Sequence, residues 1–280
     1  MNYLIFGVLG LVQGIAEFLP ISSSGHLTLF QHFFGLEETD VLLNILLHFA
    51  TMLAVWVYYY RDIWEMITEF FRWVGGLFSR KKHEGQVPEG RRMVWLLIMG
   101  TLPLVAVLFF KDAVERLCNR PEIVSIALIV TGAILFISDR LPKGKKTVRT
   151  ASFRDALFVG IAQAIATVPG ISRSGTTITA GLLRGFDRPL AVRYSFLLSL
   201  PAIVGATLLE ILDVLQQPEL VDFSLMPAYL AGMLVAGVVG YFAIGLINKL
   251  VTKGRFGVFS YYCWGAGVIF FVLSVIGWTM

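Results

Sequence analysis

The sequence predicts an all-α polytopic membrane protein with six transmembrane helices and two re-entrant broken-helix pairs, arranged as an inverted-topology repeat. Of its 280 residues, 56% are hydrophobic and only 15% are charged, whereas about one-quarter of the residues of soluble proteins are charged. In addition, residues 10–25 align with residues 160–175 at a constant offset of 150, and eight of these sixteen positions are identical. Self-similarity at a fixed offset indicates an internal duplication.

The two broken pairs are predicted at residues 3–34 and 156–183, which are apolar but interrupted near the middle by Pro, Ser and Gly. Each uninterrupted half is too short to span a bilayer, because a membrane helix needs roughly 20 residues. We therefore expect two half-helices that enter and leave on one face. Non-helical backbone at that depth is tolerated only where it is buried in protein or lines a polar cavity. Each break is thus a candidate site.

Six other apolar stretches predict the spans: 41–60, 93–110, 123–138, 190–212, 226–247 and 258–278. One broken pair followed by three spans makes up each half. We predict a single membrane domain over 1–280, with one repeat over 1–138 and the other over 155–280. Because three is an odd number, the second repeat must be upside down relative to the first, which is a transporter arrangement.

Basic residues indicate the orientation. The loop 61–92 carries seven Lys or Arg and the loop 139–154 carries six, whereas residues 213–224 carry none. The positive-inside rule places the basic loops in the cytoplasm and predicts both termini outside, with the first pair opening outward and the second inward. The start of 61–92 has the pattern of an interfacial amphipathic helix. The net charge of +4 is too small to indicate nucleic-acid binding.

The first broken pair holds the candidate reactive groups. Glu17 lies in an apolar segment, where a carboxylate near the bilayer centre costs about 2.5–3.5 kcal/mol, so we expect a function or a salt bridge with Arg173. Gln13 lies four residues earlier on the same helical face and either joins the site or bonds another helix. Ser23 and His26 share a face, and beside Glu17 they are candidates for nucleophile or general acid/base. We expect a structural role for His48.

Both half-helices that follow a break begin with residues suited to anion binding. The first-turn N–H groups of a helix lack intrahelical partners and attract phosphate, and serine is a preferred N-cap. The guanidinium of Arg173 matches phosphate oxygens bidentately. The two termini can converge on one anion from opposite faces, or the serines can simply cap the helices. The residues are Ser22, Ser23, Ser24, Gly25, Ser172, Arg173, Ser174 and Gly175.

These motifs resemble the undecaprenyl-diphosphate phosphatase family, which is linked to bacitracin resistance. The matching stretches are 13–20, 22–26 and 169–177, with weaker matches at 48–51 and 195–201. The resemblance implies a bacterial plasma-membrane enzyme that cleaves undecaprenyl diphosphate to undecaprenyl phosphate and inorganic phosphate. This reaction recycles the lipid carrier for cell-wall synthesis. The resemblance also implies a divalent cation, Mg²⁺ or Ca²⁺. In this family the first motif has Glu or Gln followed four residues later by Glu. This chain has the Gln form, a weaker clamp for a hard cation.

The expected roles follow. Glu17, His26, Ser23 and Arg173 are expected to be catalytic, with Glu17 and Gln13 holding the cation, and the nucleophile is His26, Ser23 or water. Other partners are membrane lipid and, as an open option, a second copy in a homodimer. The rival function is a transporter or flippase of an anionic or lipid-phosphate substrate. The expected substrate-binding residues are Gln13, Ser22, Ser24, Gly25, Ser172, Ser174, Gly175 and Thr177.

Overall fold

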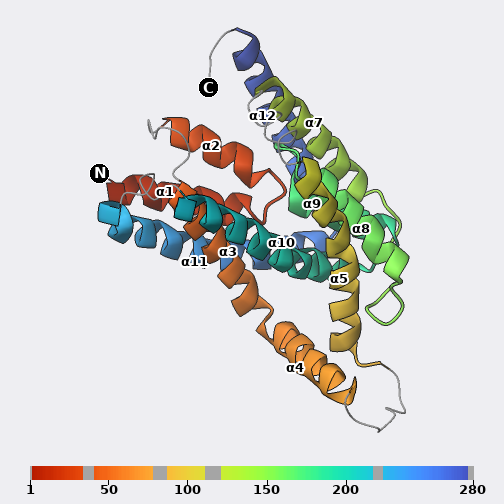
Figure 1. The fold of residues 1–280 in the computed structure, drawn as a ribbon. Coiled ribbons are helices and arrows are strands. Elements are labelled where there is room, and N and C mark those ends of the chain that lie inside the picture. Colours follow the sequence, from red (N-terminus) through yellow and green to blue (C-terminus); the bar gives the residue numbers. More distant parts are fainter. Residues whose placement is uncertain (1, 34–40, 78–86, 111–120, 217–222, 277–280) are drawn as a thin grey trace.

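The computed structural model describes residues 2–33, 41–77, 87–110, 121–216 and 223–276, and within these ranges the chain is helical with no strand. The all-α prediction is therefore confirmed (Figure 1). The helices are α1 (Asn2–Ala16), α2 (Ser23–Phe33), α3 (Val41–Tyr58), α4 (Tyr60–Leu77), α5 (Glu89–Val107), α7 (Pro121–Ser138), α8 (Phe153–Ile165), α9 (Arg173–Leu183), α10 (Arg188–Gln216), α11 (Met226–Thr252) and α12 (Phe259–Val275), with 3-10 turns η1 (Leu108–Phe110), η3 (Phe223–Leu225) and η4 (Phe256–Val258).

A helix lies at each of the six predicted spans. Within the described ranges, four segments are long and apolar enough to cross a membrane: α5, α10, α11 and α12 together with η4. Helices α3 and α4 are bent by 83° at their junction, and this bent pair gives a fifth candidate. Helix α7 is apolar but shorter. The chain is therefore a polytopic helical protein of membrane type. The last predicted span ends outside the described residues.

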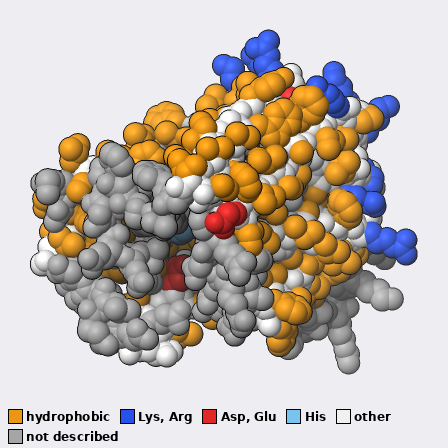
Figure 2. Space-filling model, turned by 90° about the horizontal axis from the view of Figure 1, so that it is seen from above, with side chains coloured by type: hydrophobic (Ala, Val, Ile, Leu, Met, Phe, Trp, Pro, Cys, Tyr) orange, Lys and Arg blue, Asp and Glu red, His pale blue; other side chains and the backbone are white. Residues whose placement is uncertain are grey.

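The surface agrees with a membrane environment. Large apolar side chains are well exposed, including Leu234 (69%) and Phe242 (69%) on α11 and Tyr261 (66%) on α12. Figure 2 shows hydrophobic side chains over much of the described face and Lys and Arg gathered along its margin. Lipid rather than water would cover such a surface. The direction in which the termini point stays a prediction.

Both breaks fall where the sequence predicted them. Helix α1 ends at Ala16 and α2 begins at Ser23, while α8 ends at Ile165 and α9 begins at Arg173. In the second break, Thr131 of α7 donates to the Gly170 carbonyl at 3.0 Å and accepts from the Ser172 amide at 3.1 Å. A neighbouring helix thus satisfies backbone groups that would otherwise be unpaired in an apolar environment.

The first helix of each broken pair packs on a long helix from the other half of the chain. Helix α1 packs on α11 and α8 packs on α5, while α7 packs on α12 and α3 on α10. Glycines at aligned positions allow the closest approaches. A Cβ at Gly10 would lie 2.1 Å from the Gly232 oxygen, and one at Gly160 would lie 2.2 Å from the Gly100 oxygen. Small residues therefore bring both pairs of backbones together.

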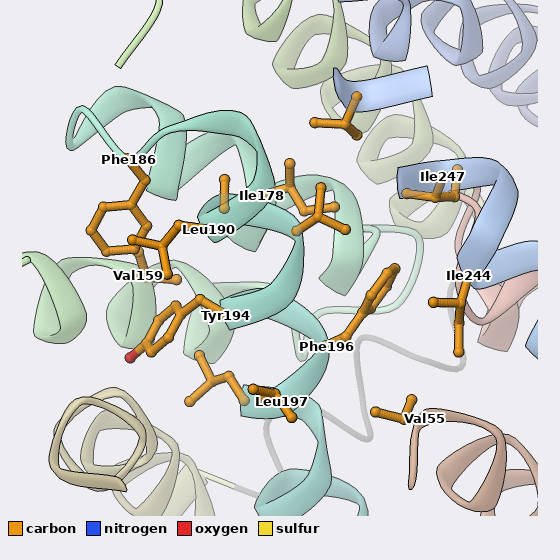
Figure 3. Close-up of a cluster of buried hydrophobic side chains, with 14 of the residues drawn as sticks. Val55, Val159, Ile178, Phe186, Leu190, Tyr194, Phe196, Leu197, Ile244 and Ile247 are labelled. Atoms are coloured by element: carbon orange, nitrogen blue, oxygen red, sulfur yellow. The ribbon is translucent and has the colours of Figure 1, made fainter. Parts of the chain in front are cut away.

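The main core surrounds α10. Figure 3 shows side chains from α3, α8, α9 and α11 gathered around this helix, among them Val159, Ile178 and Ile244. The ring of Tyr194 is fully buried, and its hydroxyl donates to the Leu96 carbonyl at 2.7 Å. A buried tyrosine usually needs such a partner. This core fixes α9 and α10, which form part of the candidate site.

Helix α4 matches the predicted amphipathic helix. Met66 faces inward (8% exposed), whereas Trp64 faces outward (67%). Ion pairs attach the helix: Asp62 accepts from Arg193 at 2.9 Å, and the buried Glu69 accepts from Arg91 at 3.2 Å. These contacts fix α4 against α5 and α10. Its location at a membrane interface stays a prediction.

Candidate active site

A cavity of about 680 Å³ lies where the two breaks meet. Residues from α5 and α10 form most of the rest of its wall, and most of those residues are apolar. The cavity therefore combines a polar end, suited to a charged group, with apolar walls, suited to a hydrocarbon. From the breaks and their neighbouring turns, its lining includes Glu17, Ser22, Ser23, Ser24, Gln163, Thr167, Ser172 and Arg173.

The Glu17 carboxylate is the centre of the polar end. Its side chain is only 2% exposed, and each oxygen has a donor. Arg173 Nη2 donates to Oε1, while Ser23 Oγ (2.8 Å) and Gln13 Nε2 (3.1 Å) donate to Oε2. The contact between Glu17 and Arg173 joins the two breaks across 156 residues of sequence. A buried charge needs such pairing and hydrogen bonding.

Arg173 is available to a ligand as well as to Glu17. Its side chain is 27% exposed and lines the cavity. It is the first residue of α9, whose N-cap Ser172 accepts from the Gly175 amide at 3.2 Å. The guanidinium and the positive end of a helix dipole therefore face the same space. This arrangement suits a phosphate group.

His48 also lies at the site, although the sequence indicated a structural role. Its Nε2 is 3.9 Å from Glu17 Oε2, and it lines the cavity with 31% of its side chain exposed. Its Nδ1 donates to the Asn44 carbonyl at 2.9 Å. Nε2 can therefore donate toward Glu17 only when the ring is protonated. The sequence signal was weak: a lone histidine on an apolar helix is usually structural, and the stretch 48–51 matched the family only weakly.

His26 lies behind the turn rather than in the cavity wall. The residue is 7% exposed, and its Nδ1 donates to the Ser22 carbonyl at 2.9 Å. Its Nε2 shares a hydrogen bond with the Tyr262 hydroxyl, and the two rings stack with centroids 5.6 Å apart. In this arrangement His26 braces the turn that presents Ser23. A direct catalytic role for His26 stays a prediction.

The expected substrate-binding residues divide into two groups. Ser22, Ser24 and Ser172 line the cavity. The rest lie behind the lining of this cavity and support it. Thr177, for example, donates to the Arg173 carbonyl at 2.8 Å and shares a 2.6 Å bond with Ser195. The supporting residues are Gln13, Gly25, Ser174, Gly175 and Thr177.

Two glutamines at aligned positions have unpaired polar atoms. Within the described part of the chain, Gln13 Oε1 and both side-chain polar atoms of Gln163 are buried with no hydrogen-bond partner. An unpaired buried polar group costs about 1–3 kcal/mol, so such atoms are typical of a site that receives a ligand. Gln163 lines the cavity, and sequence reasoning gave it no role. The sequence signal that could have identified Gln163 is that it aligns with Gln13 and is the same residue.

Comparison with known proteins gives a consistent result. Residues 6–269 match the family described as "Bacitracin resistance protein BacA". The undecaprenyl-diphosphatase of Methanosphaera stadtmanae is 41% identical over 276 residues, covering 96% of this chain and 97% of that protein. The undecaprenyl-diphosphatase of Carboxydothermus hydrogenoformans is 40% identical over 272 residues, covering 96% and 97%. That of Alkaliphilus metalliredigens is 40% identical over 271 residues, covering 96% and 98%. The chain therefore belongs to the bacitracin resistance protein BacA family.

Proposed function

We propose that this chain hydrolyses undecaprenyl diphosphate to undecaprenyl phosphate and inorganic phosphate. The observation that carries the proposal is the contact of Glu17 with both Arg173 and Ser23 at the wall of one cavity. These groups supply a cation for phosphate, a hydroxyl nucleophile and a base. The relatives from Methanosphaera stadtmanae and Carboxydothermus hydrogenoformans are undecaprenyl-diphosphatases, a name that describes the same reaction.

The first step is capture of the diphosphate by Arg173. The guanidinium is exposed to the cavity, and phosphate oxygens compete with Glu17 for its donors. First-turn amides of α2 and α9 add further donors. Charge on the transferred phosphoryl group is stabilised by this arrangement, the main source of catalysis in phosphoryl transfer.

Ser23 is the nucleophile that the geometry favours. Its hydroxyl already donates to Glu17 Oε2 at 2.8 Å, within the range expected for a catalytic base. As Ser23 Oγ bonds to the terminal phosphorus, its proton passes to Glu17. The bond from that phosphorus to the bridging oxygen breaks, and undecaprenyl phosphate leaves with the electron pair. Water then cleaves the phosphoserine. The alternatives are direct attack by water activated by Glu17, and attack by His26.

A divalent cation, Mg²⁺ or Ca²⁺, would fit the site if the protein and the substrate phosphates both coordinate it. Among the described residues, no cluster of three or more His, Cys, Asp or Glu is present, but Gln13 Oε1 is an unpaired oxygen beside Glu17. Together these two side chains offer a carboxylate and a neutral oxygen, fewer than a hard cation requires. Phosphate oxygens and water would complete its coordination. When bound, the cation would neutralise phosphate charge.

We also propose that the two halves form an inverted repeat of six spans with both termini outside the cytoplasm. The crosswise packing of α1 on α11 and of α8 on α5 supports this arrangement. So do the close approaches at the aligned residues Gly10 and Gly160. The same architecture favours the rival function, transport of a lipid phosphate.

The decisive assay measures phosphate release from undecaprenyl diphosphate by the purified protein in detergent. Because a detergent solution has no two compartments, transport alone cannot produce this signal. We expect turnover by the wild type and its loss in the presence of a chelator. Glu17→Gln is expected to lower kcat by about 10²–10⁴-fold, because it removes the base. Absence of turnover in the wild type would favour the transporter. Turnover near the wild-type rate in Glu17→Gln would contradict the proposed base.

A further inference from the structure

A second cavity of about 450 Å³ lies between α4 and α5 and reaches α10. Among the described residues that line it, Thr101 is the only polar one. The hydroxyl of Thr101 donates to the Leu97 carbonyl at 2.8 Å, so it is bonded to its own helix. We call this cavity the α4–α5 groove. Its walls include Met66, Phe70 and Phe71 on α4 and Ile98 and Leu102 on α5.

The α4–α5 groove adjoins the active-site cavity. Thr101, Val105 and Pro201 line both spaces, so the groove begins where the apolar wall of the cavity ends. The side chains along it are open to the surroundings, since Ile98 is 42% and Leu102 50% exposed. An amphiphile whose head lies near Arg173 could therefore continue into the groove.

The far wall of the groove is held in place by charged contacts. Asp62, near the start of α4, accepts from Arg193 of α10 at 2.9 Å, and Glu69 accepts from Arg91 of α5 at 3.2 Å. Glu65 Oε1 also accepts from the Gly90 amide at 3.0 Å. These bonds tie α4 to both of the other helices that line the groove. The groove is therefore a preformed feature of the fold, as small-molecule sites usually are.

We propose that the α4–α5 groove binds the polyprenyl chain of the substrate from about its third isoprene unit onward, beyond the units that lie against the apolar wall of the active-site cavity. The proposal rests on the proposed function, which places the diphosphate at Arg173 and Glu17. A prenyl chain in the bilayer is already surrounded by lipid that is as apolar as itself. Moving the chain from lipid into the groove therefore gains no hydrophobic free energy. The preference must come from packing of the branched chain against fixed side chains. The expected contribution is accordingly moderate and depends on chain length.

The test fills the groove without touching the active-site cavity. Ile98 and Leu102 line the groove but not the cavity, so Ile98→Trp and Leu102→Trp are the test variants. Leu234→Trp is the matched control, because Leu234 is 69% exposed on α11 and lines neither space. Each purified variant is assayed in detergent with undecaprenyl diphosphate and with geranyl diphosphate, whose chain is short.

We expect both test variants to lower kcat/KM for undecaprenyl diphosphate by about tenfold, equivalent to 1.4 kcal/mol. With geranyl diphosphate they should remain near the wild-type value, which also shows that they are folded. Leu234→Trp should be unaffected on both substrates. The proposal would be overturned if kcat/KM for undecaprenyl diphosphate were the same in all variants, or if the test variants lost kcat/KM equally on both substrates. If the wild type cleaves neither substrate, the proposed function itself fails.

Photolabelling gives a second, independent measurement. A polyprenyl diphosphate with a diazirine in its third isoprene unit is bound to the wild-type protein and irradiated, and the labelled peptides are identified by mass spectrometry. Labels on α4 or α5 are expected, with loss of label in Ile98→Trp. Labels confined to α11 and α12 would place the chain elsewhere and overturn the proposal.

Discussion

The two broken pairs share one backbone design but carry different chemistry. At aligned positions, the first pair has Glu17 and Ser23 where the second has Thr167 and Arg173. Both pairs contribute to one cavity, and the contact from Arg173 to Glu17 joins them. The two aligned segments thus lead into similar helix N-termini. The acid and the hydroxyl belong to the first segment, and the guanidinium of Arg173 belongs to the second.

The two breaks also differ in how the chain turns. The second break has a left-handed glycine, Gly170, with φ of 89°. The aligned residue in the first break is Pro20, whose ring fixes φ near −65°. There the left-handed conformation falls two residues later, at Ser22, with φ of 68°. A non-glycine residue in this region costs roughly 1–2 kcal/mol, so the first break stores strain next to Ser23. Strain of this kind is often found at functional sites.

Within the second pair, removal of the Arg173 guanidinium should have the largest effect on catalysis. Arg173→Ala is expected to lower kcat/KM for undecaprenyl diphosphate by about 10³-fold, because the variant loses both the phosphate grip and the partner of Glu17. Arg173→Lys should recover only part of this loss, since lysine lacks the planar fork. Phosphate release is measured on purified protein with melting temperature as the control for folding. A rate for Arg173→Ala close to that of the wild type would falsify the division between the two pairs.

Within the first pair, substitutions of Ser23 and His26 should affect different steps of the reaction. Ser23→Ala is expected to abolish a phosphorylated enzyme intermediate and to lower kcat by about 10³-fold. His26→Ala should lower kcat by about 10²-fold, because loss of its bond to the Ser22 carbonyl misplaces the turn. It should still form the intermediate, detected with radiolabelled terminal phosphate. Tyr262→Phe is the matched variant for the other side of the ring. An intermediate in Ser23→Ala that is absent in His26→Ala would reverse the two roles.

The two aligned glutamines offer a finer comparison. Gln163→Leu should raise KM for the diphosphate by about tenfold, since the side-chain amide of Gln163 is unpaired and its residue lines the cavity. Gln13→Leu should instead change the concentration of Mg²⁺ or Ca²⁺ required for half-maximal rate, because its free oxygen lies beside Glu17. Titrations of substrate and of cation on both variants separate these effects. Identical responses of the two variants would show that the aligned positions have not diverged.

The smallest effect on catalysis is expected at the start of the second pair. Asp155 is fully buried at the N-terminus of α8, where it accepts from Lys146 and Arg184, each at 2.8 Å, and from the N-cap Ser152. Burial alone would raise the pKa of Asp155, but these hydrogen bonds outweigh it and hold the pKa below its ordinary value. Asp155→Asn should cost about 2 kcal/mol of stability and change kcat less than twofold.

The sign of the pH dependence follows from the lowered pKa. The folded state binds the Asp155 proton more weakly than the unfolded state, whose pKa is about 3.9. The stabilisation is therefore present above about pH 4 and is lost as pH falls through and below that value. The melting temperatures of the wild type and Asp155→Asn should differ at neutral pH, and this difference should shrink progressively as pH falls below about 4. A constant difference across this range would mean that the Asp155 charge contributes nothing.

Local patterns were enough to predict the helices, the breaks and most of the candidate site. Apolar runs predicted each long helix, because a bilayer requires that length, and proline, glycine and serine marked both breaks. The alignment at an offset of 150 placed Glu17 and Arg173 in corresponding breaks, so a salt bridge between them could be considered before any contact was known. The bend of 83° between α3 and α4 was not predicted, because nothing in the apolar run indicated the direction of α4.

Tertiary structure decided which side chains face the shared cavity. Packing of α3 beside the break brings His48 to 3.9 Å from Glu17. His26, whose Nε2 shares a hydrogen bond with Tyr262 of α12, does not line the cavity. Helical periodicity gives the face on which a side chain lies, but not the neighbour that this face meets. The sequence by itself determined which reactive groups and breaks are present. Long-range packing determined which of them meet, because it depends on helices distant in the chain.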